Sequence, residues 1–213
     1  MTEHIKGIDA YLRETQRIID EISREKLDHF IFELYKAWKR GSNIFFVGNG
    51  GSASTAIHFA ADINNVTKEF EKKGITHLPR FRAISLNENP SRLSALTNDE
   101  GWENVYTEQL RNFWRNGDVV VAISVNGGRI DPQYGIRSKN LLEALQFAKD
   151  NGGTALSLTG FDGGVMEGLC DVNVIVPINS TPHTEGLHVV LHHLVFTELQ
   201  QRIAQSNIGE RVA

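Results

Sequence analysis

Residues 43–53 read NIFFVGNGGSA, and their pattern indicates the class of fold. It begins with a short, nearly continuous apolar run, which is typical of a strand covered on both faces. The run ends at glycines, where the backbone can turn sharply, and a helical pattern over 53–64 follows directly. A buried strand that leads through a glycine turn into a helix predicts a βαβ unit and a parallel sheet.

The same alternation continues along the chain. Similar apolar runs occur at 81–86, 118–124, 154–159 and 172–177, and helical patterns lie at about 100–114, 138–150 and 182–203. Strands that alternate with helices imply right-handed crossovers between parallel strands. We therefore predict an α/β fold with a five-stranded parallel sheet flanked by helices, in a single domain over 1–213 whose core spans 41–205.

Residues 1–40 add a helical extension before the first strand. Apolar residues recur at three- and four-residue spacing, and Ser23 followed by charged residues predicts a cap between two helices. This segment forms either an added layer or a subunit interface. The large apolar area of Phe30, Tyr35 and Trp38 favours the interface.

Composition excludes several classes of protein. The 213 residues include 22 basic and 26 acidic side chains, a net charge of −4, which argues against a general nucleic-acid binder. The single cysteine, Cys170, cannot form an internal disulfide, and this favours a reducing compartment. No apolar run approaches the length of a membrane span, and the start of the chain has no signal pattern. We expect a cytoplasmic protein with no membrane or nucleic-acid partner.

The glycine turn at 48–53 is suited to an anion. Its glycines allow the backbone to approach a ligand, and the following helix offers unpaired N–H groups. Gly48, Gly50 and Ala53 also fit the dinucleotide fingerprint, but the acidic residue that should close the second strand is missing, because Glu69 and Glu71 lie in the wrong context. We therefore expect a phosphate site without a nucleotide cofactor.

A second polar loop follows the strand at 118–124. Ser124 and Asn126 come at its end, and an eleven-residue loop over 128–138 carries Arg129 and Arg137 before Ser138 opens the next helix. Because ligands bind outside the carboxyl ends of such strands, this loop is expected to bind sugar hydroxyls or a phosphate, and the arginines could assist. A plain exposed loop is the alternative for the arginines.

Histidines and carboxylates gather on two of the predicted helices. His58 and Asp62 are four residues apart and share one helix face. Four of the eight histidines lie between His183 and His193, with Glu185 in the first turn of the last helix. This set suits zinc or acid–base chemistry, although each group could also be an ordinary surface or core contact.

Together these residues resemble a sugar isomerase (SIS) domain, specifically the phosphoheptose isomerase family. The segments that carry the resemblance are GNGGS at 48–52, HFAAD at 58–62, TND at 97–99, GDVV at 117–120 with IS at 123–124, and LTGFDGG at 158–164. The resemblance spans about 40 to 200 and implies a flavodoxin-like SIS fold that assembles as a homotetramer.

The resemblance also implies an activity and a set of site residues. The family converts sedoheptulose 7-phosphate to D-glycero-D-mannoheptose 7-phosphate through an enediol. The matching substrate-binding positions are Asn49, Gly50, Gly51, Ser52, Asn98, Asp99, Ser124, Val125, Asn126 and Ser138. The matching zinc ligands are His58, Asp62, Glu185 and His193, and Asp62, Glu185 and His193 are the expected catalytic residues.

Three departures bear on this transfer. Asp62 replaces a longer Glu, Glu185 replaces a Gln, and the loop before Ser138 carries an insertion over 128–137. Helical periodicity raises a further alternative, because His188 and His192 lie nearer the face of Glu185 than His193 does. The resemblance to the family favours His193 as the zinc ligand.

The function expected from the sequence is therefore a sugar-phosphate isomerase with zinc. Two alternatives remain from other classes or substrates. One is a non-catalytic SIS module that binds a sugar phosphate or a partner protein, and the other is an isomerase of a different phosphorylated sugar. A dinucleotide-dependent enzyme is the least favoured alternative, because the acidic residue of the dinucleotide fingerprint is missing.

Overall fold

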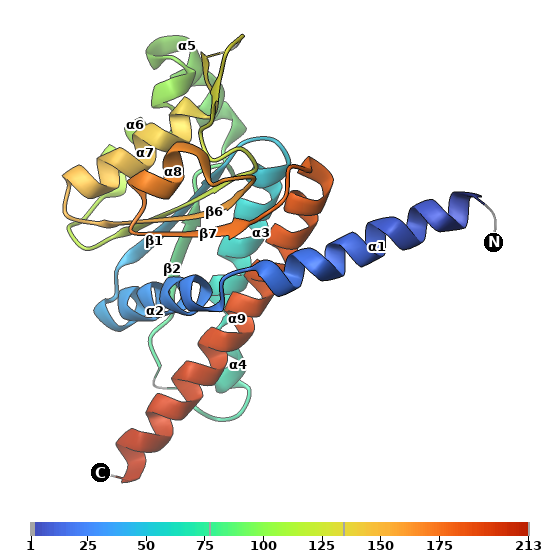
Figure 1. The fold of residues 1–213 in the computed structure, drawn as a ribbon. Helices are drawn as coiled ribbons and strands as arrows, with labels where there is room; N and C mark the ends of the chain where they lie inside the picture. Colours follow the sequence, from blue (N-terminus) through green and yellow to red (C-terminus); the bar gives the residue numbers. More distant parts are fainter. Residues whose placement is uncertain (1–2, 77, 134, 213) are drawn as a thin grey trace.

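The computed structural model describes residues 3–76, 78–133 and 135–212, and its centre is a parallel five-stranded sheet (Figure 1). The strands are β1 (Asn43–Gly48), β2 (Arg82–Ser85), β3 (Val119–Ser124), β6 (Thr154–Gly160) and β7 (Val172–Val176). Their order, β2-β1-β3-β6-β7, reverses direction between β1 and β3, as in flavodoxin-like folds. All five predicted strands and the predicted fold class are confirmed.

Each face of the sheet has its own apolar core. Phe46 contributes to the core beneath α2 (Arg24–Arg40), α3 (Gly51–Asn65) and α9 (Thr181–Val212). Its neighbours Phe45 and Val47 contribute to the opposite core, beneath α6 (Thr107–Phe113) and α7 (Lys139–Asp150). Successive side chains of a strand point to opposite faces, and burial on both faces is why the central strands are apolar throughout.

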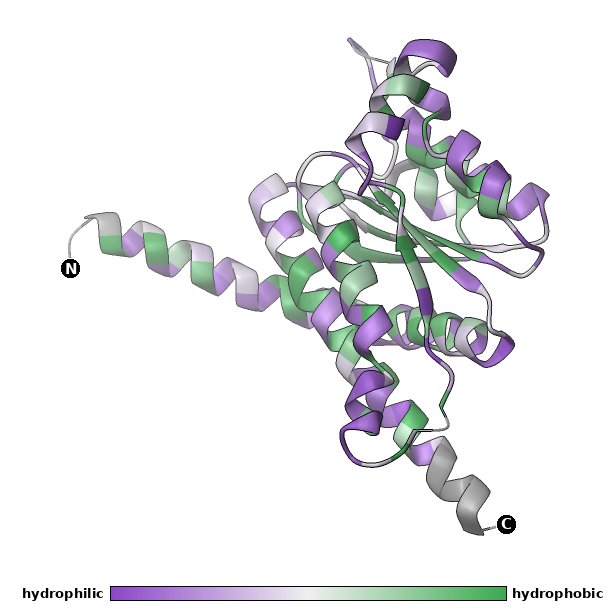
Figure 2. Ribbon diagram, turned by 180° about the vertical axis from the view of Figure 1, so that it is seen from behind, coloured by the Kyte–Doolittle hydropathy of each residue, from purple (hydrophilic) through white to green (hydrophobic). Residues whose placement is uncertain are grey.

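The predicted break in the N-terminal segment is present. Ser23 caps α2, where its side chain accepts a hydrogen bond from the Lys26 N–H at 3.2 Å, and α1 (Glu3–Glu21) precedes it. Figures 1 and 2 show α1 extending away from the body of the molecule with apolar residues along its length. Phe30 and Trp38 of α2 lie in the chain's own core instead of at an outer surface. The expectation that Phe30, Tyr35 and Trp38 offer their apolar area to another subunit is therefore wrong, because α2 packs these side chains against the chain's own core. The exposed large apolar side chains of this segment lie mostly on α1.

Three segments differ from the sequence-based expectation. The single helix expected over about 100–114 is wrong, because α5 (Pro90–Glu100) ends before Gly101 at φ +83° and α6 begins only at Thr107, after the short helix η1 (Trp102–Asn104). The loop expected over 128–138 contains a hairpin formed by β4 (Ile130–Asp131) and β5 (Gly135–Ile136). Two short helices, α4 (Lys68–Glu71) and α8 (Gly164–Leu169), complete the fold.

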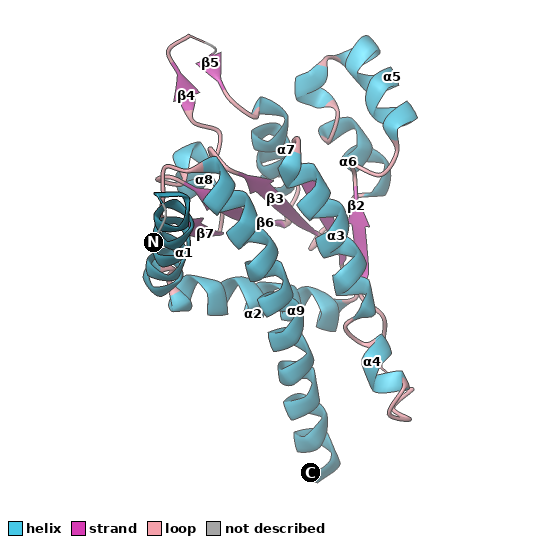
Figure 3. Ribbon diagram, turned by 90° about the vertical axis from the view of Figure 1, so that its right-hand side faces the viewer, coloured by secondary structure: helices cyan, strands magenta, loops and turns pink. Residues whose placement is uncertain are grey.

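Helices α3 and α9 lie side by side and run in the same direction from the carboxyl edge of the sheet (Figure 3). The β4–β5 hairpin projects beyond that same edge. Among the described helices, none is long and apolar enough to cross a membrane.

Candidate functional site

A cavity of about 380 Å³ opens at the carboxyl edge of the sheet, where the strand order reverses between β1 and β3. This switch point is where open α/β sheets bind their ligands. The cavity is lined by Asn49, Gly50, Gly51, Ser52, Ile123, Ser124, Val125, Asn126, Arg137, Ser138, Leu141, Thr181 and Glu185. Eight of the ten positions predicted to bind substrate are therefore together in one cavity.

The turn after β1 forms a fixed cradle. Gly50 has φ +57°, a left-handed conformation that favours glycine, and a Cβ on Gly48 would lie 2.4 Å from the Ser52 carbonyl oxygen. The side chains of Asn49 and Asn140 donate to each other at 2.9 Å. The Tyr106 hydroxyl donates to the Gly48 carbonyl at 2.6 Å. Sequence reasoning missed Asn140 and Tyr106, because neither lies near a glycine motif.

The opposite wall comes from the loop after β3 and the start of α7. The Gly127 N–H donates to the Ser124 hydroxyl at 3.1 Å, and that hydroxyl lies 3.5 Å from the Ser138 hydroxyl. Ser138 adopts a left-handed conformation, with φ 55° and ψ 37°, which is uncommon for a residue with a Cβ. Hydroxyls and backbone N–H groups at one edge are suited to a phosphate or to sugar hydroxyls.

Asn98 and Asp99 do not join this cavity. Both lie exposed in α5, where the Asn98 amide donates to the Asp99 carboxylate at 2.8 Å. Asn98 instead lines a separate, open depression beside Trp102. The structure therefore does not bring these two predicted substrate-binding residues to the others.

A cluster of three histidines and one carboxylate lies between α3 and α9. The Asp62 Oδ2 atom is 3.3 Å from His192 Nδ1, 3.4 Å from His193 Nε2 and 3.5 Å from His58 Nε2. One ligand-type atom from each residue lies within 4.8 Å of all the others. Three of the four predicted metal ligands, His58, Asp62 and His193, are thus brought together, and His192 joins them.

The chemistry of this cluster fits a divalent metal ion. Asp62 Oδ2 and both ring nitrogens of His192 are buried without a hydrogen-bond partner. Zinc bonds of about 2.0–2.1 Å place ligand atoms about 3.3–3.4 Å apart in a tetrahedron, which is close to the spacing around Asp62. Burial, and to a smaller extent the neighbouring His193 and His58, together lower the pKa of His192 to about 3. The ring is therefore held neutral, which is the form that binds metals.

Glu185, the fourth predicted ligand, lies outside this cluster. Its carboxylate packs against Gly51, where a Cβ would be 2.5 Å from Oε1. Eight residues of helix separate Glu185 from His193, which is about 12 Å along the axis. Glu185 therefore stands at the level of the cradle at the start of α3, whereas His193 stands beside His58, two turns farther along. Within the described residues, His192 occupies the place in the metal-type cluster that was expected for Glu185.

His188 also lies apart from the cluster. It is fully buried, and neither ring nitrogen has a geometrically sound hydrogen bond among the described residues. Burial lowers its pKa to about 4, against a smaller raising effect of the Thr159 backbone. His188 is a neutral core residue, so only one of the two histidines favoured by periodicity reaches the metal-type cluster.

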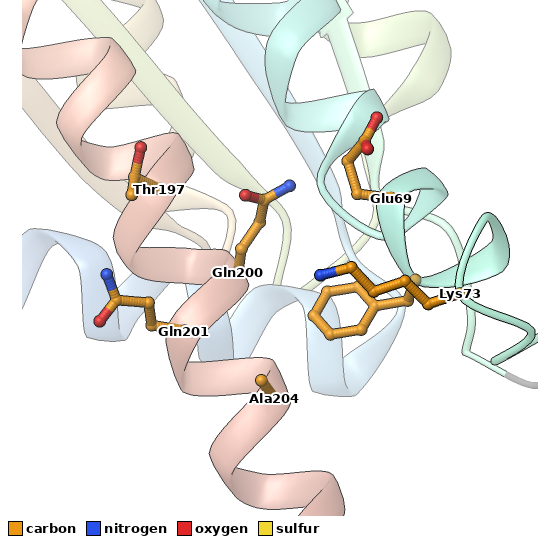
Figure 4. Close-up of a pocket in the computed structure, with 7 residues that line it drawn as sticks. Glu69, Lys73, Thr197, Gln200, Gln201 and Ala204 are labelled. Carbon is orange, nitrogen blue, oxygen red and sulfur yellow. The ribbon is translucent and has the colours of Figure 1, made fainter.

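A second cavity, of about 310 Å³, lies between α4 and the middle of α9 (Figure 4). Gln200 and Lys73 face each other across it, and the Gln200 amide donates to the Val66 carbonyl at 3.5 Å. None of the site residues predicted from the sequence lines this cavity.

Comparison with known proteins agrees with this architecture. The SIS domain family matches residues 10–160 of the chain. The phosphoheptose isomerase of Helicobacter pylori strain P12 is 36% identical over 187 residues, which cover 88% of this chain and 89% of that protein. A solved phosphoheptose isomerase from Neisseria gonorrhoeae has a TM-score of 0.78 at 28% identity, with 92% of this chain and 98% of that chain covered.

The sheet order and the cavity at its switch point are those of a flavodoxin-like ligand-binding domain, and the family match shows that the chain belongs to the SIS domain family. Within that family it belongs with the phosphoheptose isomerases, to which it is related over most of its length. The lincomycin biosynthesis protein LmbN of Streptomyces lincolnensis is a further relative, 37% identical over 85% of this chain and 64% of that protein.

Proposed function

We propose that this chain is an aldose–ketose isomerase that interconverts sedoheptulose 7-phosphate and D-glycero-D-mannoheptose 7-phosphate. The observation that carries the proposal is the relationship to phosphoheptose isomerases over 88% of the chain, combined with the cavity at the switch point of the sheet. The reaction moves a proton between C1 and C2 of the sugar through an enediol, and it needs no redox cofactor.

The cavity binds the phosphorylated sugar. The N–H groups at the start of α3 and the hydroxyls of Ser52, Ser124 and Ser138 face one space, which suits phosphate oxygens and sugar hydroxyls. Glu185 in the same wall accepts hydrogen bonds from substrate hydroxyls. His58 follows Gly51 by seven residues, about 10 Å of helix. An extended seven-carbon chain spans about 7–8 Å between its end carbons, so a heptose 7-phosphate has the length to approach both regions.

Asp62 and His193 carry the proton transfer. A carboxylate has two oxygens, so Asp62 can face the histidines through Oδ2 and accept the C1 proton on Oδ1. His193, whose side chain is half exposed, assists by moving a proton between O1 and O2 of the enediol while the C2 proton is delivered.

We further propose that His58, Asp62, His192 and His193 hold zinc. Three imidazoles and one carboxylate form a donor set typical of this metal. When bound, zinc would polarise the sugar carbonyl as a Lewis acid. The three ring nitrogens already converge on one carboxylate oxygen, so the ligand atoms are close to the positions that the metal requires.

The assembly we propose is a homotetramer formed in part through α1. Ile8 and Leu12 on this helix are 60% and 58% exposed, and Ile5 and Tyr11 add to the same helix. Apolar residues of this size on a projecting helix are suited to packing against another copy. We also propose that the protein acts in the cytoplasm, where a reduced thiol at Cys170 is expected.

An isomerase of another phosphorylated sugar is the second candidate. It is favoured by the β4–β5 hairpin, whose Arg137 reaches the cavity wall, and by the relationship to LmbN. Both candidates share the enediol step and differ in the sugar.

The test is proton NMR of the zinc-supplied protein with sedoheptulose 7-phosphate in deuterated water. We expect aldose signals and deuterium at C1 or C2, and we expect both to disappear in Asp62→Asn. No exchange at high protein concentration would contradict the heptose assignment. Exchange with a different phosphosugar would then select the second candidate, and phosphosugar binding without any exchange would indicate a non-catalytic module.

A further inference from the structure

The cavity wall carries few charged side chains. Among the described residues that line it, Arg137 is the one cation and Glu185 is the one anion. A phosphate monoester carries a charge of about −1.5 to −2 near neutral pH. Glu185 alone would repel such a ligand, so the wall attracts an anion through Arg137, its one cationic side chain among the described residues, and through the partial positive charge of the helix N-termini that line it, at the starts of α3, α7 and α9.

The β4–β5 hairpin holds Arg137 at the mouth of this cavity. The Arg137 backbone N–H donates to the Arg129 carbonyl at 3.0 Å, which closes the hairpin. The Arg137 guanidinium donates to the Asp131 carboxylate on the other strand at 3.1 Å. A guanidinium has five N–H donors in a fixed fork, so it can bind a carboxylate and a phosphate oxygen together.

The next residue turns the chain from the hairpin toward the cavity floor. Ser138 takes a left-handed conformation, a strained geometry that tends to persist at functional sites, and it begins α7. Its hydroxyl lies 3.5 Å from Ser124, on the wall opposite the α3 cradle. Arg137 and Ser138 are thereby adjacent donors on the same rim of the cavity.

We propose that Arg137 is the phosphate-binding cation of this site, and that the β4–β5 hairpin is the element that supplies it. The proposal rests on the proposed function, in that the ligand is a phosphorylated sugar. Arg137 binds and orients the phosphate group and takes no part in the proton transfer. Its loss therefore raises KM and leaves kcat nearly unchanged.

The test compares Arg137→Gln with Arg129→Gln, which removes the same charge from the same hairpin at a residue that does not line the cavity. Inorganic phosphate is titrated into each protein and followed by ³¹P NMR, and KM and kcat are measured with sedoheptulose 7-phosphate. Hydrogen bonds to charged groups are worth enough that Arg137→Gln should weaken phosphate binding and raise KM by about 10- to 100-fold. Arg137→Lys should recover part of the loss, because it restores the charge without the fork.

Phosphate affinity equal in the two glutamine variants, or no phosphate binding by the unaltered protein, would overturn the proposal. A fall in kcat with unchanged KM in Arg137→Gln would also overturn it. If Arg137→Gln alone loses phosphate binding while the unaltered protein isomerises no heptulose phosphate, then Arg137 keeps its role and only the proposed function fails.

Discussion

The side chain of His192, and not that of Glu185, completes the metal-type cluster of His58, Asp62 and His193. The ring is completely buried between α3 and α9, and its Nδ1 lies 3.3 Å from Asp62. A buried imidazole without a hydrogen-bond partner is costly unless a ligand satisfies it. Glu185, which the family resemblance predicts to be a ligand, packs its carboxylate against Gly51 instead.

This difference predicts how two variants should bind zinc. His192→Leu preserves a buried apolar shape but removes a ligand, so it should lower zinc affinity by at least about 100-fold, more than the loss of an outer partner. Glu185→Gln should leave zinc affinity within a few-fold of that of the unaltered protein. Competition titration with a chromophoric chelator measures both. The opposite ranking would restore Glu185 as the ligand.

His188 makes a second prediction, on stability against pH. Its pKa is about 4 in the folded protein, below the ordinary value of 6.5, because burial disfavours the charged ring. Below pH 6.5 the unfolded chain binds a proton that the folded protein does not, so the free energy of unfolding falls between pH 6.5 and 4 by up to about 1.4 kcal/mol per pH unit.

The measurement is urea unfolding across this range with the metal chelated, in the unaltered protein and in His188→Leu. In the leucine variant, the free energy of unfolding should depend less steeply on pH, by the contribution of one proton. The other histidines still contribute to the slope. An identical slope in both proteins would show that His188 does not titrate this way.

At the scale of elements, the parallel packing of α3 and α9 determines which residues meet. Glu185 is level with Gly51, His192 and His193 are level with His58, and Gln200 reaches the Val66 carbonyl. These pairs keep nearly the same offset along both helices, because each helix rises about 1.5 Å per residue. Glu185 therefore lies at the glycine-cradle end of the site, about 12 Å along the helix from His193.

The junction between the hairpin and α7 gives the third prediction. A left-handed conformation costs a residue with a Cβ roughly 1–2 kcal/mol, and glycine avoids most of that cost. Ser138→Gly should therefore be about 1 kcal/mol more stable than Ser138→Ala, as measured by urea unfolding. Both variants lose the hydroxyl beside Ser124, so both should raise KM to a similar extent. Equal stability would indicate that the junction is not strained.

At the scale of the whole molecule, the N-terminal part of α1 projects away from the body of the chain (Figure 1), whereas Ile18 near its other end is buried in the core. Replacing Ile8 and Leu12 together by serine should shift the proposed tetramer to smaller species, because each side chain of this kind that is buried in an interface contributes about 1.5–3 kcal/mol. Light scattering after size exclusion measures the change. Lys6→Ser with Arg13→Ser, two exposed polar positions of the same helix, is the control and should leave the assembly intact. Unchanged mass in the apolar variant would remove α1 from the interface.

Much of the fold could be predicted because its signals are local. The apolar run over 43–48, bounded by glycines, is a strand in any environment that buries both faces, and Ser23 caps a helix through its own neighbours. The hairpin at 130–136 was missed because its strands are two residues long and give no periodic pattern. The predicted helix over 100–114 failed where Asn89, Pro90 and Gly101 set different helix ends.

The alternation of strands and helices and the glycine cradle at 48–52 could be predicted from short-range chemistry, namely hydrophobic period, capping and backbone freedom. The candidate residues His58, Asp62 and His193 came from the resemblance to the family, because periodicity favoured His188 and His192 over His193. That His192 joins the cluster, that Glu185 packs against the glycine cradle, and that Asn98 and Asp99 stay outside the cavity became visible only in the folded chain. Those outcomes depend on the offset between α3 and α9 and on where α5 packs, and such long-range contacts are encoded by the whole core and not by any one segment.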